Sequence, residues 1–400
     1  MSRKWPEVPL GEVCSSVVRT VKVQPAKEYR TIGVRWWGEG AYEREAIDGS
    51  RTAARALFTV KAGDLIINKI WVRHGSVAIA SEAVDGCSAS NEFPMFQLNS
   101  ERVLTRWIHW HTKTREFRAR CAALSQGTSG KNRIRPERFL TIPIPLPPLR
   151  EQRRIGVKID QLAAKIDEAR RLRQECSRQL DRLNTSGLRQ VFNEVTQLYG
   201  TRALEGLLVE AGYGTSAKCH SARFSDAMPI LRIPNVASEK IDLTDLKFAS
   251  LSERDLRKVQ LMPDDLLVVR TNGSANLVGR CAVVPRLREP NGFASYLIRL
   301  RCDGAQADAN YVQWMLRFLR VDGRLFDFAR TTAGQYNVSL GRLRAAELPV
   351  PPLEEQRRIV AYLDDAQARI DRLKALQGTT AAELDAVLPS ILDKAFKGEL

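Results

Sequence analysis

The chain has 400 residues, 44% of them hydrophobic, and 62 Lys and Arg against 46 Asp and Glu, which gives a net charge of +16. This composition excludes wholesale disorder, and the length suits two domains better than a single core. The positive excess favours a polyanionic partner, nucleic acid first, over a protein that merely has a basic surface.

Residues 1–148 are predicted to form a first α+β head. The segment FTVKAGDLIINKI at 58–70 predicts a turn at Gly63-Asp64 followed by a buried strand, and RWIHWHTKTREFRARCAAL predicts a helix from near Arg106. Basic, aromatic and amide residues gather in the loops RWWGEG (35–40), NKIWVRHGS (68–76) and GTSGKNRIR (127–135). The candidate DNA contacts in these loops are Arg35, Trp36, Trp37, Lys69, Trp71, Arg73, His74, Thr128, Lys131, Asn132 and Arg133.

A long helix is predicted over residues 149–195, after a proline-rich run (142–148) that excludes helix. Its apolar or small residues recur at coiled-coil-like spacing with one slip. They are Ile155, Ile159, Leu162, Ile166, Ala169, Leu172, Cys176, Leu180 and Leu183.

Residues 196–352 are predicted to form a second α+β head. VQLMPDDLLVVRT at 259–271 resembles the 58–70 segment, with its turn at Asp264-Asp265, and a helix is expected from near Asn310. The corresponding loops are GYGTSAKCH (212–220), RTNGSANLVGR (270–280) and TTAGQYN (331–337). Their candidate DNA contacts are Tyr213, Thr215, Ser216, Lys218, Arg270, Asn272, Ser274, Arg280, Gln335, Tyr336 and Asn337.

The chemistry of these loops favours DNA reading. Arg and Lys pair with guanine, Asn and Gln with adenine, and hydroxyl or backbone donors with phosphate. Any one loop taken alone is more simply a solvated turn, whereas six at corresponding places on two basic heads favour DNA contact. The leading candidates are Arg270 and Asn272 in the second head, and Lys69, Arg73, Lys131 and Asn132 in the first.

A second long helix is predicted over residues 353–400, and it reveals a tandem repeat. PLPPLREQRRI (145–155) and PVPPLEEQRRI (349–359) share nine of eleven positions at an offset of 204 residues. The apolar stripe recurs with the same spacing at Ile359, Leu363, Ala366, Ile370, Leu373, Leu376, Thr380, Leu384 and Val387.

The repeat predicts an α+β protein of two pseudo-symmetric heads, each followed by a long helix. The two helices are expected to pack antiparallel as a coiled coil, with the alternative that each covers only its own head. A helix of about 40 residues spans about 60 Å, so the pair would hold the heads apart as a ruler for half-sites on DNA.

These motifs, in this order, resemble the DNA-specificity (S) subunits of type I restriction–modification systems. The resemblance rests on LPPLREQRRI, VPPLEEQRRI and the closing ILDKAFKGEL, with GVRWWGEG, INKIWVRHGSVA, GYGTSAKC, PILRIPNV and RTNGSANLVGR in the heads. It implies two target-recognition domains that read a bipartite site on double-stranded DNA. It also implies docking of two methyltransferase (M) subunits, with restriction/translocase (R) subunits joining them. S-adenosylmethionine, ATP and Mg²⁺ would then belong to the partners, and no cofactor to this chain.

No catalytic motif emerges from the sequence. GTSGKN lacks the phosphate-loop spacing, no N/D-P-P-Y/F/W tetrapeptide occurs, and His109 and His111 are two apart on a helix and cannot chelate one metal. The seven cysteines are dispersed without a CxxC pair, which predicts reduced thiols and no zinc site. No signal-peptide core or membrane-length apolar run occurs, so a soluble cytoplasmic protein is expected.

Two other function classes are weighed against the specificity subunit. A fused nuclease or methyltransferase would need the motifs that are missing. A coiled-coil adaptor, or a nucleic-acid-binding protein without base-specific readout, would explain the helices but not the amide-rich loops.

Overall fold

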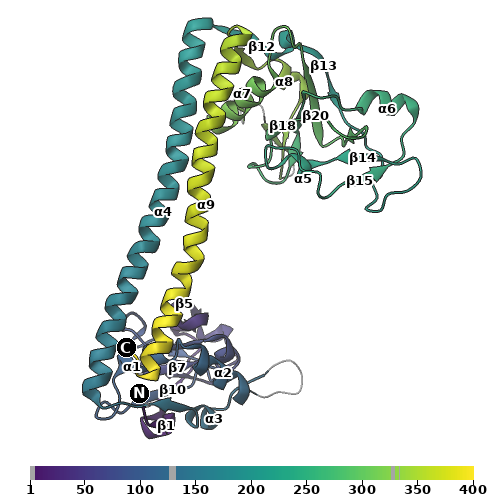
Figure 1. Cartoon of the computed structure of the whole chain (residues 1–400). Helices are drawn as coiled ribbons and strands as arrows, with labels where there is room; N and C mark the ends of the chain where they lie inside the picture. The colour runs from purple at the N-terminus through teal and green to yellow at the C-terminus, as the bar shows by residue number, and fades with distance from the viewer. Residues whose placement is uncertain (1–4, 126–131, 326–328, 333) are drawn as a thin grey trace. The chain divides into compact units, whose positions relative to one another are not determined.

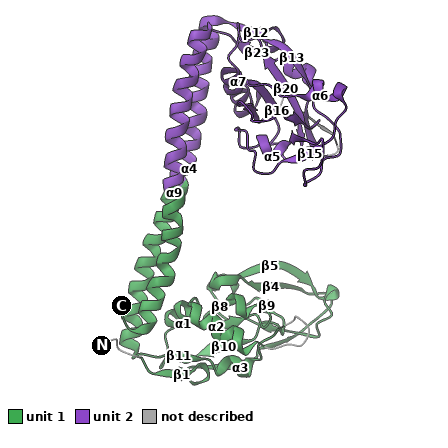
Figure 2. Cartoon of the chain, turned by 45° about the vertical axis from the view of Figure 1, so that its right-hand side comes forward, with its two compact units in different colours: residues 1–174, 377–400 green, residues 175–376 purple. Residues whose placement is uncertain are grey.

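The computed structural model describes residues 5–125, 132–325, 329–332 and 334–400. The chain divides into two compact units, one of residues 1–174 with 377–400 and one of residues 175–376 (Figure 2). Each unit holds one α+β head and a part of both long helices, α4 (Leu149–Tyr199) and α9 (Leu353–Lys397) (Figure 1). Among the described helices, none combines the length and apolarity that crossing a bilayer requires.

The head of the first unit is built on three sheets. Strand β1 (Glu7–Pro9) pairs with β11 (Pro143–Pro145), so the proline-rich run forms an edge strand. A four-stranded antiparallel sheet has the order β2 (Cys14–Val17), β10 (Met95–Leu98), β7 (Leu65–Ile67), β8 (Val77–Ile79). A five-stranded sheet has the order β3 (Thr20–Lys22), β6 (Ala56–Thr59), β9 (Ser88–Ala89), β4 (Glu28–Val34), β5 (Ala41–Asp48). The helices are α1 (Thr105–His111), α2 (Arg115–Leu124) and α3 (Pro136–Leu140), with 3-10 turns η1 (Leu10–Glu12), η2 (Trp36–Gly38), η3 (Gly49–Arg51), η4 (Val72–His74) and η5 (Glu82–Val84).

The head of the second unit repeats two of these sheets. Strand β12 (Thr201–Ala203) pairs with β23 (Glu347–Pro349), and the four-stranded antiparallel sheet has the order β13 (Leu208–Tyr213), β20 (Leu297–Cys302), β16 (Asp265–Val269), β18 (Cys281–Val283). Two further sheets are β15 (Lys247–Ala249), β14 (Met228–Leu231), β19 (Gly292–Phe293), and β17 (Thr271–Asn272), β22 (Gln335–Val338), β21 (Ala329–Thr332). The helices are η6 (Leu204–Leu207), α5 (Ile233–Val236), α6 (Glu253–Val259), α7 (Ala309–Val321) and α8 (Leu340–Arg344).

The glutamine of the repeated EQRRI motif ties each long helix to its head. The buried Gln152 accepts a hydrogen bond from the Leu104 amide (2.8 Å) and donates to the carbonyls of Arg102 (3.0 Å) and Pro147 (2.8 Å). Gln356, 204 residues later, makes the same three bonds to the residues at equivalent positions. The tandem repeat of the sequence is therefore a repeat of structure.

A buried tryptophan fixes a second point of the repeat. The indole of Trp110 donates to Asp160 of α4 at 2.6 Å, and that of Trp314 donates to Asp364 of α9 at 2.9 Å. Both tryptophans, and Trp107, are nearly inaccessible, so all three belong to the cores of the heads.

The two long helices pack antiparallel within each unit, as predicted. In the first unit Arg170 pairs with Asp385 at 2.9 Å, and in the second Lys374 pairs with Asp181 at 2.6 Å. Each helix also enters the head cores: Ile155 and Phe396 lie in the first, and Phe192 and Ile359 in the second. The alternative that each helix covers only its own head is therefore wrong, because each helix contributes to both head cores.

The apolar stripe predicted on each helix is only partly buried in the structure. Leu172 and Leu183 are 53% and 66% exposed, and Leu373 and Leu376 are 48% and 59% exposed. The guanidinium of Arg173 instead reaches across to the Gln377 carbonyl and the Thr380 hydroxyl of α9. Polar contacts replace knobs-into-holes packing there.

The prediction of a single helix from near Arg106 is wrong, because the segment forms two helices, α1 and α2. Helix α1 ends at His111, and α2 begins after Thr114, whose hydroxyl accepts from the Phe117 amide at 3.1 Å. A threonine that caps a new helix competes with continuation of the old one. The equivalent α7 runs unbroken from its cap, Asp308. The predicted turns at Gly63 and Asp264 are confirmed, since both have left-handed φ angles, of 87° and 67°.

Candidate nucleic-acid interface

Two of the predicted loops of the first head meet. The Gly38 amide donates to the Gly75 carbonyl at 2.8 Å, and the Ser76 hydroxyl donates to the Val34 carbonyl at 2.8 Å. Gly75 has a φ of 75°, and a Cβ there would lie 3.0 Å from the Cα of Trp37. Glycine is therefore required for the close approach of the loops.

This contact assembles an aromatic cluster of Trp36, Trp37, Trp71 and His74. The ring of Trp36 lies 5.2 Å from Trp71 and 5.4 Å from His74, and Trp37 lies edge-on to His74 at 6.4 Å. Trp36, Trp37 and Trp71 remain 45%, 54% and 37% exposed. The predicted residues of two separate loops thus form one surface.

Cations border the aromatic cluster. The Arg73 guanidinium lies 5.9 Å from the Trp71 ring and donates through Nε to His74 Nε2 at 3.1 Å. Arg118 of α2 lies 5.4 Å from the Trp37 ring. Arg118 was not predicted, since helical periodicity places it on α2 without revealing which loop it meets.

The other candidate DNA contacts of the first head are held by contacts outside the aromatic cluster. The Lys69 carbonyl accepts from the Ile134 amide at 3.0 Å, which brings Asn132 and Arg133 near the 68–76 loop. Arg133 forms an ion pair with Glu92 at 3.3 Å. Arg35 stacks on Tyr42 at 4.5 Å. Thr128 and Lys131 lie outside the described residues.

The second head assembles a polar cluster of Tyr213, Arg270, Asn272, Tyr336 and Asn337. The Arg270 guanidinium lies 4.5 Å from the Tyr213 ring, and Tyr213 Oη accepts from the Leu340 amide at 3.0 Å. Strands β17 and β22 pair Asn272 with Tyr336, and Thr271 with Asn337. Gln335, at the turn end of the β21–β22 hairpin, is exposed.

Two polar atoms of the polar cluster are unsatisfied. Arg270 Nε and Asn337 Oδ1 are buried and have no hydrogen-bond partner within the described part of the chain. Most buried polar groups in proteins are paired, so these two atoms are exceptions within the described residues. Tyr296 joins this surface: its carbonyl accepts from the Arg270 amide at 2.9 Å, and its side chain is 57% exposed. The sequence offered no signal for Tyr296, which lies in a short turn outside the glycine-rich loops.

The remaining second-head candidates hold loops or face solvent. Arg280 donates to the Asn276 carbonyl at 2.8 Å and the Ala237 carbonyl at 2.6 Å, which fixes its loop. Thr215 Oγ1 accepts from the Ala217 amide at 3.0 Å. The Ser274 amide donates to Asn272 Oδ1 at 2.8 Å. Ser216 and Lys218 are exposed.

The two clusters occupy equivalent places in the two heads. The Val338 amide donates to the Arg270 carbonyl at 2.9 Å, just as Ile134 donates to Lys69, and Val338 follows Ile134 by the repeat offset of 204 residues. Lys69 is therefore the structural counterpart of Arg270. The two segments then diverge, since Trp71 precedes the 3-10 turn η4 whereas Thr271 and Asn272 form strand β17.

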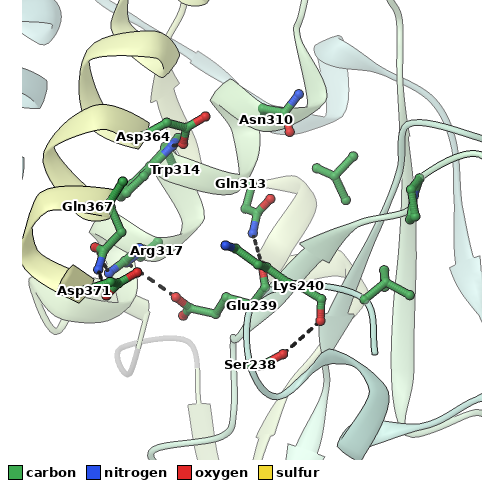
Figure 3. Close-up of a pocket in the computed structure, with 14 residues that line it drawn as sticks. Ser238, Glu239, Lys240, Asn310, Gln313, Trp314, Arg317, Asp364, Gln367 and Asp371 are labelled. Carbon is green, nitrogen blue, oxygen red and sulfur yellow. Dashed lines mark hydrogen bonds and ion pairs between the residues drawn. The ribbon is translucent and has the colours of Figure 1, made fainter. Parts of the chain in front are cut away.

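Each unit also contains a recess beneath its buried tryptophan. In the second unit a recess of about 730 Å³ lies between α7 and α9, and Arg317 lies 4.6 Å from the Trp314 ring and donates to Gln367 at 2.7 Å (Figure 3). In the first unit a recess of about 810 Å³ includes Lys113, which lies 4.8 Å from the Trp110 ring. Burial lowers the pKa of both Lys113 and Arg317. Lys113 and Arg317 are again 204 residues apart.

The described residues contain no group of three or more His, Cys, Asp and Glu side chains arranged to hold a metal ion. Burial lowers the pKa of His109 to about 4 and that of His111 to about 3. His111 packs on Phe117 and Phe396, whereas His109 packs edge-on to Trp110. All seven cysteines are free.

Residues 2–176 match the protein family described as the type I restriction modification DNA specificity domain. The type I restriction enzyme EcoKI specificity subunit of Escherichia coli K12 is 29% identical over 310 residues, which cover 74% of this chain and 66% of that protein. The StySPI specificity subunit of Salmonella potsdam is 26% identical over 346 residues, 81% of this chain and 74% of that protein.

Solved structures share the fold. A chain from a study of complex assembly and conformational transition of the type I restriction–modification system aligns with a TM-score of 0.77 and 23% identity, over 100% of this chain and 99% of that one. The HsdS subunit from Thermoanaerobacter tengcongensis aligns with a TM-score of 0.63 and 23% identity, over 100% and 98%. The sequence matches and the shared fold agree: the chain is similar in sequence to type I restriction–modification specificity subunits and shares the fold of the solved HsdS subunit.

Proposed function

We propose that this chain is the DNA-specificity subunit of a type I restriction–modification complex and that each head reads one part of a bipartite site. The observation that carries this proposal is the equivalence of Lys69 and Arg270. The carbonyl of each accepts a backbone hydrogen bond from an equivalent residue of the repeat, Ile134 or Val338. One scaffold thus presents a different cation, with different neighbours, in each head.

The chemistry of Arg270 suits guanine. An arginine donates two parallel hydrogen bonds to the O6 and N7 atoms of guanine in the major groove. Tyr213 holds the guanidinium on one face, and Nε is buried without a partner among the described residues. Asn272, Tyr336 and Asn337 add the amide and hydroxyl groups that read adenine or contact phosphate.

The surface charge supports a DNA partner for both heads. Residues 1–148 contain 23 Lys and Arg against 14 Asp and Glu, and residues 196–352 contain 21 against 16, so each head alone is cationic. A cationic head binds any duplex weakly by release of counterions, and its base contacts then select the site. The domains of this proposal are a target-recognition domain at 1–148, a helix at 149–195, a second target-recognition domain at 196–352 and a helix at 353–400.

The proposed partners are two methyltransferase subunits, with restriction/translocase subunits joining them. The equivalent recesses at Trp110 and Trp314 support two copies of one partner, because each offers a cation on an indole beside a long helix. S-adenosylmethionine, ATP and Mg²⁺ are assigned to these partners.

The test is DNA binding by the chain together with its methyltransferase. Affinity for a duplex with the complete site is expected to exceed that for either half-site duplex by at least 100-fold, and to fall steeply with salt. Equal affinity for complete, half and scrambled sites, with the partner bound, would contradict the proposal and favour an adaptor without base-specific readout.

A further inference from the structure

We propose that the aromatic cluster of the first head stacks against an opened base step, so that its half-site is read partly through the deformability of the DNA. This inference rests on the proposed function and assigns a mode of recognition to the first head. It makes the two heads unlike in chemistry although they share one frame.

The rings of the aromatic cluster are exposed to solvent. Trp36, Trp37 and Trp71 gather within one cluster while 45%, 54% and 37% of their surface stays in water. Scattered exposed apolar residues are ordinary, whereas a contiguous group of large rings is unfavourable in water and marks a binding surface. Aromatic faces are also the surfaces on which nucleic-acid bases stack.

The two loops that carry the aromatic cluster are held rigidly against each other. The Gly38–Gly75 hydrogen bond and the close approach of Gly75 to the Trp37 backbone hold the two loops together. Trp37 itself has a φ of 60°, a conformation that side chains other than glycine seldom adopt. A preorganised aromatic cluster loses less conformational entropy on binding than a mobile one.

Positively charged side chains surround the aromatic cluster. Arg73 lies on Trp71, and Arg118 lies on Trp37, so cations border the rings on both sides. Lys113 approaches the same loop, since a Cβ at Gly38 would lie 2.8 Å from its side chain. An apolar peptide gains nothing from such cations, whereas a base flanked by phosphates matches both the rings and the charges.

The aromatic cluster also has little capacity to read base edges by hydrogen bonds. The polar cluster of the second head contains Asn272, an amide able to pair with adenine, whereas the first head presents Trp71. Tryptophan has a single donor and no acceptor, so it cannot read a base pair by paired hydrogen bonds. Apolar side chains inserted at a base step unstack it and kink the duplex, and pyrimidine–purine steps open most readily.

The experiment uses the complex of this chain with its methyltransferase and a duplex that carries 2-aminopurine in place of single adenines. The half-site of the first head is the one left unchanged by Arg270→Ala. Binding is expected to raise 2-aminopurine fluorescence severalfold at one step of that half-site. The double variant Trp36→Ala/Trp71→Ala is expected to abolish the rise and to weaken binding at least tenfold, while Trp36→Phe retains the rise. Tyr199→Ala removes an exposed ring from α4 and serves as the control.

Each outcome decides the inference. Sequence-selective binding without any fluorescence rise would overturn the stacking mode and leave the proposed function intact. Trp37 also lines the recess of the first unit, so assembly with the methyltransferase is measured without DNA. Tryptophan variants that weaken this assembly would overturn the inference and make the cluster a protein contact. Loss of all sequence selectivity in the wild-type complex would instead contradict the proposed function.

Discussion

Gln152 and Gln356, which are 204 residues apart, make the same three hydrogen bonds to equivalent backbone atoms. Each side chain is fully buried where a long helix leaves its head. The side-chain amide of each glutamine hydrogen-bonds two backbone carbonyls and one backbone N–H group of its head. These three bonds fix the direction in which the helix leaves the head.

Gln152→Leu is expected to destabilise the chain by about 2–4 kcal/mol, because it leaves the Leu104 amide and the carbonyls of Arg102 and Pro147 without their partner. Denaturant unfolding measures the loss, and Gln356→Leu is expected to give a similar one. The matched control is Gln161→Leu, at an exposed position of the same helix α4. A Gln152→Leu chain as stable as this control would show that the hydrogen bonds do not fix the helix.

Arg270→Ala is expected to relax recognition in one half-site only, at a cost of about 1–3 kcal/mol for the preferred base. Arg270→Lys keeps the charge but loses the planar fork, so it is expected to retain affinity and lose discrimination. Competition binding with single-base variants of the site measures both effects. Arg257→Ala, which removes an exposed cation of α6, is the control. Equal weakening at every sequence would make Arg270 a phosphate contact.

The buried His111 is expected to make stability depend on pH. Burial lowers its pKa from 6.5 to about 3, so the unfolded chain binds a proton that the folded chain rejects. Its contribution to stability is present above pH 6.5 and is lost as the pH falls towards 3, by about 1.4 kcal/mol per pH unit. His111→Phe should reduce the slope of unfolding free energy against pH between 6.5 and 5 by this amount. The control is His220→Phe at an exposed site, and an unchanged slope in His111→Phe would refute the assignment.

Thiol reactivity is expected to separate the cysteines by burial. Burial raises the pKa of Cys14 and Cys302 to about 12, and it also raises the pKa of Cys121 and Cys281, so these thiols resist alkylation at neutral pH. Cys176 is exposed on α4 and should react first. Mass spectrometry after brief alkylation identifies the site. If the Cys176→Ser variant is still alkylated as rapidly as the wild-type chain, the reactive thiol is not Cys176.

The frame of the fold could be predicted from the sequence, because its signals are local and repeated. The EQRRI motif and the apolar stripe predicted two long helices, and the match of 58–70 with 259–271 predicted a turn followed by a buried strand in each head, as the structure confirms. The members of both clusters were among the candidates chosen by residue type, together with others, such as Arg280 and Lys218, that lie outside the clusters.

Features that depend on distant contacts could not be predicted. Arg118 and Tyr296 reach the clusters from segments with no loop signature. Periodicity treats every apolar position of a stripe alike, so it did not distinguish the buried Ile155 from the exposed Leu183. Only the packed partner decides which positions are covered.

Methylation mapping of DNA from cells that carry this chain with its methyltransferase tests whether the two heads read DNA separately. Two heads on one repeated frame predict a split motif, with two short specific sequences around a fixed nonspecific gap, and Arg270→Ala should alter only one of them. An unsplit motif, or methylation independent of sequence with the partner active and bound, would contradict the account of two separate readers.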